Sequence, residues 1–279
     1  MKLSGVVVFY NPSIDNITNI NNYLDEVDKL YVVDNTDDEI IRMESNSKIE
    51  YIKLGDNKGI AYALNVGARK AIDEGYKYLL TLDQDSKMNN DILKQMKDYL
   101  IHTNDDKIGL ISPYQDIDAK DDKPTKDVED MIEVMTSGNI INLEAYQDIG
   151  GFKDWLFIDC VDTDYCMNLH KHGYKVLRLN NIVMKHELGD LVVHKLFGKE
   201  YPCYNHNPIR RYYIVRNNMY ICDMYGDMYP DYCAWLKRVQ KGQVKRIIAV
   251  ENNKFKKLKM MLKGYRDYKK RLKGKLNNT

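Results

Sequence analysis

Two aspartates one residue apart, Asp83 and Asp85, follow directly on the apolar run of residues 78–82. The run is typical of a buried strand, and a polar stretch begins at residue 86. On an extended chain the side chains at i and i+2 point the same way, so we expect both carboxylates to face one direction. Carboxylate oxygens suit Mg²⁺ or Mn²⁺ that carries a phosphate-bearing substrate. A solvated turn after the strand would explain the same residues, and the spacing alone leaves both interpretations open.

A second acidic cluster consists of Asp159, Asp162 and Asp164, and it follows the apolar residues 155–157. Asp159 and Asp162 lie near a predicted helix N-terminus, where the helix macrodipole favours carboxylates and lowers their pKa. Helix capping accounts for one acid, Asp159 for example, but three acids within six residues exceed what a cap needs. A carboxylate at the edge of an apolar pocket is a suitable general base for a sugar hydroxyl.

Strands and helices must alternate to position these acids. The strands are predicted at residues 6–9, 29–33, 49–54 and 78–82, and the helices at 16–27, 60–74 and 91–100. This alternation predicts βαβ units and a parallel sheet. The carboxyl ends of parallel strands lie along one edge, where open α/β sheets bind ligands. We therefore expect a group of short polar side chains to gather there: Asn11, Asp34, Asn57, Asp83 and Asp85.

The middle of the chain continues this pattern with less regular spacing. The elements predicted there are strands at 108–113, 134–142 and 175–179, helices at 143–149 and 162–172, and an exposed loop at 115–130. His186 follows the last strand, and it suits either a metal ligand or a core histidine. No internal repeat is visible, and no long linker separates domains before about residue 200.

Length and composition bound the class of protein. A chain of 279 residues can hold one large α/β domain, or a domain with an appendage. No apolar stretch approaches the roughly 18 residues of a spanning helix, and the start lacks the layout of a signal peptide, so we expect a cytoplasmic protein. The five cysteines lack Cys-x-x-Cys pairing, which favours reduced thiols over a zinc site.

The chain becomes strongly basic from Lys237 onwards, although its net charge is only +1. One explanation is a solvated helix whose apolar stripe packs on the body, and the other is a basic amphipathic helix on an anionic membrane surface. We expect no nucleic-acid partner, because no recognition motif accompanies the charge. The apolar residues interleaved at helical spacing are Phe255, Leu258, Met261, Leu262 and Tyr265.

These motifs together resemble the family 2 glycosyltransferases of the GT-A fold, and more closely the bacterial rhamnosyltransferase and galactofuranosyltransferase branch. The matching segments keep the family's order from residue 6 to residue 217. They are residues 7–12, 32–36, 57–67, 82–86, 159–166, 172–174 leading to His186, and 210–217, the last being similar to the segment after the catalytic core of the rhamnosyltransferases. One departure is Met167 and Asn168, where many members have an arginine after the base.

The resemblance implies an α/β, GT-A (nucleotide-diphospho-sugar transferase) fold, with a mixed, mainly parallel sheet flanked by helices at residues 1–217. Residues 218–279 would form a C-terminal basic helical extension. The implied activity is metal-dependent, inverting transfer of a sugar in bacterial surface polysaccharide synthesis, with Mn²⁺ or Mg²⁺ as cofactor. The donor would be a dTDP- or UDP-sugar, dTDP-L-rhamnose in the closest branch, and the acceptor a saccharide or a lipid-linked molecule. If the basic C-terminal helix binds a membrane rather than packing on the body, such a cytoplasmic protein would be peripheral on the inner face of the cell membrane.

The resemblance also implies roles for single residues on the donor side. Asp34 would hydrogen-bond the nucleotide base, Asp83 would lie near the ribose and the metal, and Asp85 would ligate the metal directly. His186 would complete the contact with the metal or the diphosphate. Further donor contacts are implied at Phe9, Asn11, Asn57 and Lys58.

On the acceptor side, the resemblance makes Asp162 the catalytic base and Asp164 a nearby acid that binds the acceptor. We expect acceptor contacts at Trp155 and Asp159 as well. Asp162 would remove the proton of the acceptor hydroxyl as its oxygen attacks the anomeric carbon from the face opposite the nucleotide. The leaving diphosphate would carry its charge onto the metal at Asp85.

Three other functions use similar residues. A non-catalytic nucleotide-sugar-binding module of a polysaccharide assembly complex would keep the donor site, but the intact Asp83, Asp85 and Asp162 argue against lost catalysis. A Mg²⁺-dependent nucleotidyltransferase or phosphohydrolase predicts a Gly-rich loop or a basic cluster near the first strand, and residues 9–12 supply neither. Galactofuranosyl or hexosyl transfer from a UDP-sugar stays open within the family.

Overall fold

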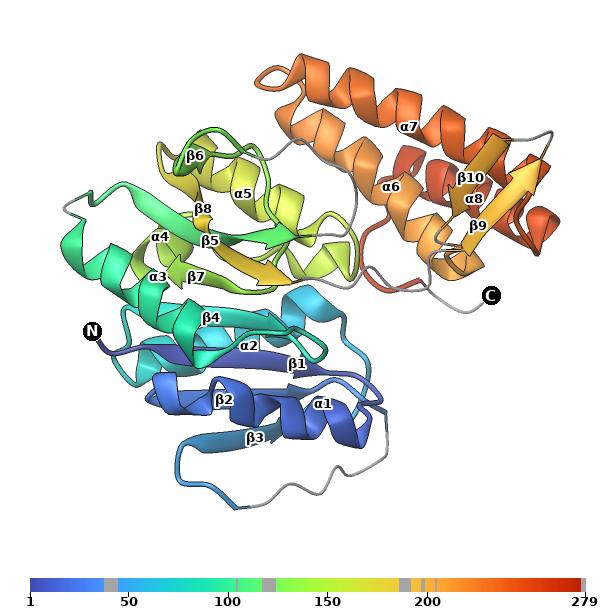
Figure 1. Ribbon diagram of the computed structural model, residues 1–279. Coiled ribbons are helices and arrows are strands. Elements are labelled where there is room, and N and C mark those ends of the chain that lie inside the picture. Colours follow the sequence, from blue (N-terminus) through green and yellow to red (C-terminus); the bar gives the residue numbers. More distant parts are fainter. Residues whose placement is uncertain are drawn as a thin grey trace. The chain divides into compact units, whose positions relative to one another are not determined.

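The computed structural model describes residues 1–37, 45–103, 105–116, 124–185, 192–196, 199–203 and 205–276. Its internal contacts divide the chain into two compact units. The first unit consists of residues 1–154 and 161–186, and the second of residues 155–160 and 187–279. Figure 1 labels their helices and strands.

The first unit is built on a mixed sheet that has eight strands in the described part of the chain. Their order across the sheet is β3-β2-β1-β4-β7-β5-β8-β6. Neighbours pair in parallel from β3 to β4 and between β5 and β8, whereas β7 and β6 run antiparallel to their neighbours. This confirms the predicted mixed, mainly parallel sheet. The strands are β1 (Ser4–Phe9), β2 (Lys29–Asp34), β3 (Ile49–Lys53), β4 (Tyr78–Asp83), β5 (Ile108–Asp116), β6 (Val128–Asp130), β7 (Asn139–Asn142) and β8 (Lys175–Lys185).

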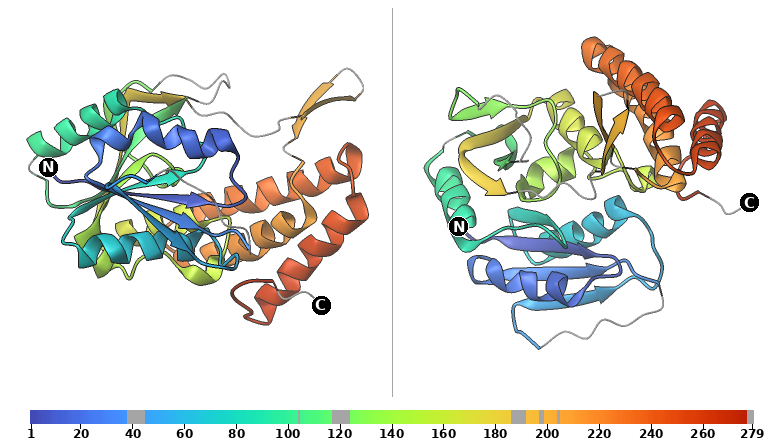
Figure 2. Two further views of the ribbon diagram at one scale, coloured as in Figure 1. Left: turned by 90° about the horizontal axis from the view of Figure 1, so that it is seen from below. Right: turned by 45° about the vertical axis from the view of Figure 1, so that its right-hand side comes forward.

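Helices cover both faces of this sheet, and Figure 2 shows α1 and α3 on one face with α2 and α5 on the other. The central strands are therefore apolar on both faces, as is usual when helices cover a parallel sheet. On the second face α2 approaches β1 closely, because a Cβ added at Gly67 would lie 2.3 Å from a methyl of Val6. The helices are α1 (Ile14–Asn19), α2 (Ile60–Asp73), α3 (Asn90–His102), α4 (Leu143–Asp148) and α5 (Val161–Lys171).

Three predicted elements differ from the structure. The helix predicted at residues 16–27 breaks into α1 and two 3-10 turns, Ile20–Asn22 and Leu24–Glu26. Asparagine is a poor helix former, and Asn19 instead donates its side-chain amide to the carbonyl of Ser86 at 2.7 Å. The strand predicted at residues 134–142 is limited to β7, because Gly138 has a φ of +85°. The loop predicted at 115–130 contains the short edge strand β6.

In its described residues, the second unit contains two antiparallel strands and three α-helices. Helix α8 lies close along α6, because a Cβ added at Gly264 would lie 2.5 Å from the carbonyl oxygen of Tyr212. The predicted domain boundary between residues 217 and 218 falls inside α6, so the second unit takes up residues that the prediction gave to the first domain. The elements are β9 (Val192–Leu196), β10 (Lys199–Cys203), α6 (Pro208–Tyr225), α7 (Pro230–Ala249) and α8 (Lys254–Lys269).

The apolar stripe predicted for the basic C-terminal helix is divided between two environments. Leu258 and Met261 pack in a small core against α6 and α7. Phe255 is 89% exposed, and Leu262 and Tyr265 are exposed as well. One side of α8 therefore packs on its own unit, and the other presents apolar and basic side chains to solvent. Among the described residues, no helix is both long enough and apolar enough to cross a membrane.

Candidate active site

The strand register brings the predicted donor-binding acids to one edge of the sheet. Asp34 at the end of β2 pairs with Phe9 at the end of β1, and Asp83 at the end of β4 pairs with Val8 on the other side of β1. Asp34 and Asp83 are thus two strands apart, a backbone separation of roughly 10 Å. The predicted gathering of polar residues at the carboxyl ends of these strands is confirmed for this pair.

The chain turns immediately after Asp83, so the extended geometry predicted for Asp83 and Asp85 is wrong. The backbone N–H of Ser86 donates to the carbonyl of Asp83 at 3.2 Å, which closes a β-turn over Gln84 and Asp85. Asp83 is half-buried and Asp85 is exposed. Ser137, just before β7, fixes this turn from the neighbouring strand: its hydroxyl accepts from the N–H of Asp83 at 3.1 Å and hydrogen-bonds Ser86.

The carboxylate of Asp34 is fully buried and has three partners. One oxygen accepts from the backbone N–H of Thr36 at 2.9 Å, and the other accepts from the hydroxyl of Tyr51 and from the Nζ of Lys53, the latter at 3.0 Å. Burial raises the pKa of Asp34, but these hydrogen bonds outweigh it and hold the pKa below its ordinary value. A nucleotide base would have to share this carboxylate with Tyr51 and Lys53, and its contact with the base stays a prediction.

We expect Asp34 to stabilise the fold in a pH-dependent way. Because its pKa is lower in the folded state, its contribution is fully present above the unfolded pKa of about 3.9 and is lost as the pH falls through the folded pKa. Wild type should therefore exceed Asp34→Asn in free energy of unfolding at pH 6, and this difference should shrink near pH 3. Urea unfolding at both pH values measures it, with the exposed Asp15→Asn as control. A difference that does not change with pH would contradict this assignment.

Asn35 organises the other predicted donor contacts, although the sequence did not single out its side chain. Its amide donates to the side-chain oxygen of Asn57 at 3.2 Å, and its own oxygen accepts from the N–H of Lys58 at 2.8 Å. Lys58 is exposed. Asn11, also exposed, has a φ of +46° and donates its N–H to the hydroxyl of Thr36.

The side chain of Phe9 lies in the hydrophobic core beneath this edge. Its contact with a donor therefore stays a prediction.

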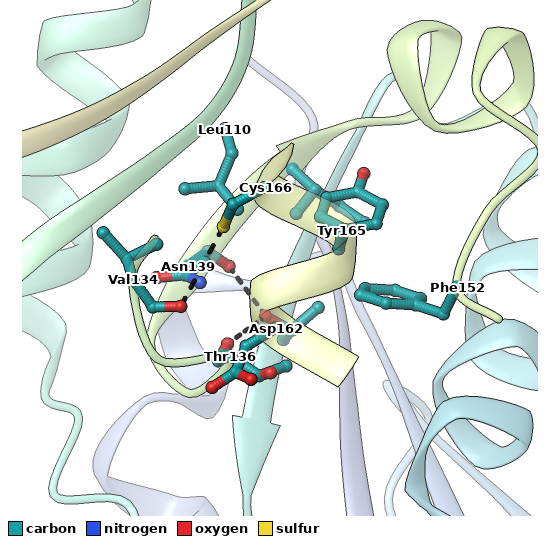
Figure 3. A pocket seen from close by; sticks show the side chains of 10 residues that line it. Leu110, Val134, Thr136, Asn139, Phe152, Asp162, Tyr165 and Cys166 are labelled. Carbon is teal, nitrogen blue, oxygen red and sulfur yellow. Dashed lines mark hydrogen bonds between the residues drawn. The ribbon is translucent and has the colours of Figure 1, made fainter. Parts of the chain in front are cut away.

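Asp162 lies in the first turn of α5, beside the strand that ends at Asp83. It lines a small cavity together with Thr136, which precedes β7, and Asn139 of β7 (Figure 3). Thr81 of β4 lines the same cavity. Thr81 is only two residues before Asp83, so the cavity that Asp162 lines and the predicted metal-binding turn both adjoin β4. The cavity has a volume of about 10 Å³, which is room for about one water molecule and too small for a sugar.

Asp164 is fully buried, and both its carboxylate oxygens accept from the Nζ of Lys153 at 2.9 Å. Asp164 is thus part of a buried ion pair within the fold. Its contact with the acceptor stays a prediction. Lys153 was not predicted as a site residue, although a lysine shortly before an acidic cluster is a visible signal. Glu133 was not predicted as a site residue either. Its carboxylate accepts a hydrogen bond from the hydroxyl of Thr163, next to Asp162, at 2.6 Å.

Trp155 and Asp159, the other predicted acceptor contacts, belong by their contacts to the second unit. Asp159 pairs with the Nε of Arg210 at 3.0 Å. Burial raises the pKa of this carboxyl above its ordinary value although the guanidinium of Arg210 opposes the rise, so the lowered pKa predicted for Asp159 is wrong. The Trp155 ring meets Tyr220 edge-on at 5.0 Å and has the Nζ of Lys273 4.4 Å from its centre.

The residues at the turn fit a divalent metal ion. Mg²⁺ is typically held by one or two carboxylates together with waters and substrate phosphates, so it does not require a cage of protein ligands. The half-buried Asp83 and the exposed Asp85 supply that number of carboxylates. His186 lies outside the described residues, and within the described ones no three His, Cys, Asp or Glu side chains cluster as a metal site.

Known proteins are similar to this chain in sequence or in fold. The profile described as glycosyl transferase family 2 matches residues 6–160, more than half of the chain. The chain belongs to glycosyl transferase family 2. Within this family it is 31% identical over 236 residues to the dTDP-rhamnosyl transferase RfbF of Shigella flexneri, a match that covers 77% of this chain and 78% of that protein. This family 2 member is therefore a rhamnosyltransferase-like glycosyltransferase.

Solved structures agree with the fold of a family 2 enzyme. S. aureus TarS 1-349 in complex with UDP-GlcNAc superposes with a TM-score of 0.57 at 14% identity, over 96% of this chain and 80% of that chain. GalNAc-T7 with UDP, GalNAc and Mn²⁺ superposes with a TM-score of 0.55 at 11% identity, over 97% of this chain and 56% of that chain. These likenesses confirm the expected GT-A-like fold.

Proposed function

We propose that this glycosyltransferase is metal-dependent and inverting, and that it transfers L-rhamnose from dTDP-rhamnose to a saccharide or lipid-linked acceptor in bacterial surface polysaccharide synthesis. The observation that carries the proposal is the placement of two kinds of acid around β4. Asp85 is exposed in the turn after the strand. Asp162 of α5 lies beside Thr81, which is a residue of the strand. The rhamnosyl donor rests on the printed name of the Shigella flexneri relative.

Asp83 and Asp85 would hold the metal, and His186 is the proposed further ligand. Mn²⁺ or Mg²⁺ bound there would stabilise the negative charge on the departing nucleoside diphosphate. Ser137 keeps the turn in place through the N–H of Asp83. Asp34 and the Asn57–Lys58 segment at the same edge are the proposed contacts of the nucleotide, Lys58 contributing an exposed positive charge near the phosphates.

Asp162 is the proposed general base. As the acceptor hydroxyl oxygen forms its bond to the anomeric carbon, Asp162 takes the hydroxyl proton, and the bond from the anomeric carbon to the diphosphate oxygen breaks. The electron pair of that bond leaves with the nucleoside diphosphate. Because attack and departure occur on opposite faces, the anomeric configuration inverts.

A thermal-shift panel with UDP, dTDP, GDP and CMP, each with and without Mn²⁺, tests the donor site. We expect one nucleoside diphosphate to raise the melting temperature only when Mn²⁺ is present, because ligand binding to the folded state stabilises it. Stabilisation by UDP rather than dTDP would favour galactofuranosyl or hexosyl transfer. Binding without sugar transfer to any acceptor would favour the alternative of a non-catalytic nucleotide-sugar-binding module.

We also propose that the second unit docks on an anionic membrane surface, at the inner face of the cell membrane. The acids that follow Lys237 are Glu251 and Asp267, and both are buried and paired, so this part of the unit presents cations to solvent. Phe255 is exposed, and so are Lys254 and Lys256, its neighbours in the sequence. An exposed aromatic side chain among lysines suits the interface of an anionic bilayer, where each cation contributes about 1 kcal/mol.

Vesicle co-sedimentation tests this surface. Because α8 packs on α6, substitution of exposed residues is a cleaner change than removal of the helix. The triple variant Phe255→Ser, Lys256→Glu and Lys259→Glu should have an affinity for phosphatidylglycerol-containing vesicles that is lower by about tenfold or more. Lys94→Glu with Lys171→Glu, on the first unit, makes the same change in charge and should bind as wild type does. Equal binding by the triple variant and the control would remove the membrane proposal.

A further inference from the structure

The loop of residues 155–160 has an unusual backbone. Phe157, Asp159 and Cys160 have φ values of +68°, +62° and +63°, a backbone region that residues other than glycine rarely adopt. The N–H of Ile158 donates to the carbonyl of Leu156 at 2.8 Å, which closes a tight turn around Phe157. Such a conformation persists only where the surroundings hold it in place.

Asn217 of α6 holds the backbone of this loop. Its side chain is fully buried, and its amide nitrogen donates to the carbonyls of Leu156 at 2.9 Å, Ile158 at 2.8 Å and Asp159 at 3.0 Å. One amide group thus reaches three carbonyls that the turn brings together. An ordinary extended or helical segment does not present its carbonyls in this way, so the contact selects the strained conformation.

Arg216 adds a second set of contacts to the same loop. Its guanidinium donates to the carbonyls of Trp155 at 3.1 Å and Leu156 at 3.2 Å, and to that of Gly274 near the C-terminus at 2.6 Å. Its Nε donates to the side-chain oxygen of Asn217 at 3.0 Å, which turns the amide nitrogen of Asn217 towards the loop. Arg216 is 1% exposed, so these bonds form away from water.

Side chains of the loop contact the same stretch of α6. Phe157 stacks on Tyr213 with ring centres 5.1 Å apart, and the thiol of Cys160 donates to the side-chain oxygen of Asn218 at 3.0 Å. Arg210 pairs with Asp159. The segment 210–217, whose sequence resembles that of the rhamnosyltransferases, is therefore the structure that holds this loop.

We propose that Arg216 and Asn217 are positioning residues for sugar transfer. The loop continues through Val161 directly into Asp162, so its backbone conformation sets where α5 begins. The proposal rests on the proposed function, in which Asp162 is the base. The proposed connection between the second unit and Asp162 is the covalent chain through Val161. Substitutions of Arg216 and Asn217 should therefore lower turnover without changing the donor site at the end of β4.

Asn217→Asp tests the proposal, because aspartate keeps the shape and the oxygen that accepts from Arg216 but replaces the donor with an acceptor. Tyr268→Phe, on α8 of the same unit, is the matched control, because it removes the hydrogen bond from the tyrosine hydroxyl to Asp223 and leaves the contacts of Arg216 and Asn217 in place. Both variants are compared with wild type by thermal unfolding, by hydrogen exchange of the peptide covering 155–161, by dTDP binding with Mg²⁺, and by transfer kinetics with dTDP-rhamnose.

We expect Asn217→Asp to exchange faster in the loop and to lose kcat by about 10- to 100-fold, with dTDP affinity and donor KM within twofold of wild type. Tyr268→Phe should keep kcat within twofold even if its melting temperature falls. Should Asn217→Asp not fold, Asn217→Ser removes the same bonds to the loop without burying a carboxylate, and it should show the same faster exchange and a similar loss of kcat.

Faster loop exchange with an unchanged kcat would overturn the positioning role and leave the proposed function standing. An equal loss of kcat in Tyr268→Phe would overturn it too, because the effect would then follow the stability of the unit. A wild type that transfers no sugar from any nucleotide donor would overturn the proposed function, and the positioning role with it.

Discussion

Asp162→Asn should lower kcat by about 10²- to 10⁴-fold and leave donor binding intact. Asparagine has nearly the shape of aspartate but cannot take up the proton of the acceptor hydroxyl, and a well-placed general base contributes about this factor. The loss should fall on turnover, because Asp162 lies at the start of α5 beside Thr81 and the donor contacts lie at the ends of β2 and β4. Transfer kinetics and dTDP binding with Mg²⁺ separate the two effects.

Asp91→Asn is the matched control for this variant. Asp91 is exposed and lies in the first turn of α3, and Asp162 is half-buried and lies in the first turn of α5, so both changes remove a carboxylate that interacts favourably with a helix N-terminus. Both variants should therefore lose a similar, small amount of stability. Turnover should fall only in Asp162→Asn. Near-normal turnover in that variant would exclude Asp162 as the base.

Asp85→Ala should remove the dependence of nucleotide binding on metal and lower kcat by about 10²- to 10³-fold. The carboxylate is exposed in the turn after β4, and its loss would leave the leaving diphosphate without the charge stabilisation that a bound metal gives. Calorimetric titration of dTDP with and without Mg²⁺ measures the binding effect independently of activity. In wild type Mg²⁺ should tighten dTDP binding, and in Asp85→Ala it should not.

The exposed Asp15 of α1 provides a control for Asp85, since Asp15→Ala removes the same charge from a different element. It should retain the full Mg²⁺ effect on dTDP affinity. If Asp85→Ala also retains the full Mg²⁺ effect, the metal is held elsewhere, and Asp85 has no direct part in the site.

The edge of the sheet could be predicted because apolar strands and helices alternate cleanly in the first hundred residues. Once the strands are parallel, their ends must share an edge, and the register then brings Asp34 and Asp83 to either side of β1. The direction of Asp85 could not be predicted in this way. It depends on a β-turn that Ser137, more than fifty residues away in the sequence, fixes through the N–H of Asp83.

The second acidic cluster divides for a similar reason. Its three acids read as one group in the sequence, but Asp164 is neutralised by Lys153 and Asp159 by Arg210, whereas Asp162 lines the cavity. The pairing of Asp159 with Arg210 depends on distant packing that no local pattern reveals, whereas Lys153 lies only 11 residues before Asp164. The segment 210–217 was visible as a resemblance, but its role depends on the carbonyls of the loop, which only the folded chain brings together.

The anomeric configuration of the first sugar product tests the central claim most directly. Proton NMR can follow dTDP-rhamnose with Mg²⁺ and wild-type protein, with water or an added saccharide as acceptor. We predict that the sugar first appears with the configuration opposite to that in the donor, that omission of Mg²⁺ abolishes the reaction, and that Asp162→Asn slows it at least a hundredfold. Retained configuration, or equal rates with and without Mg²⁺, would contradict metal-dependent inverting transfer.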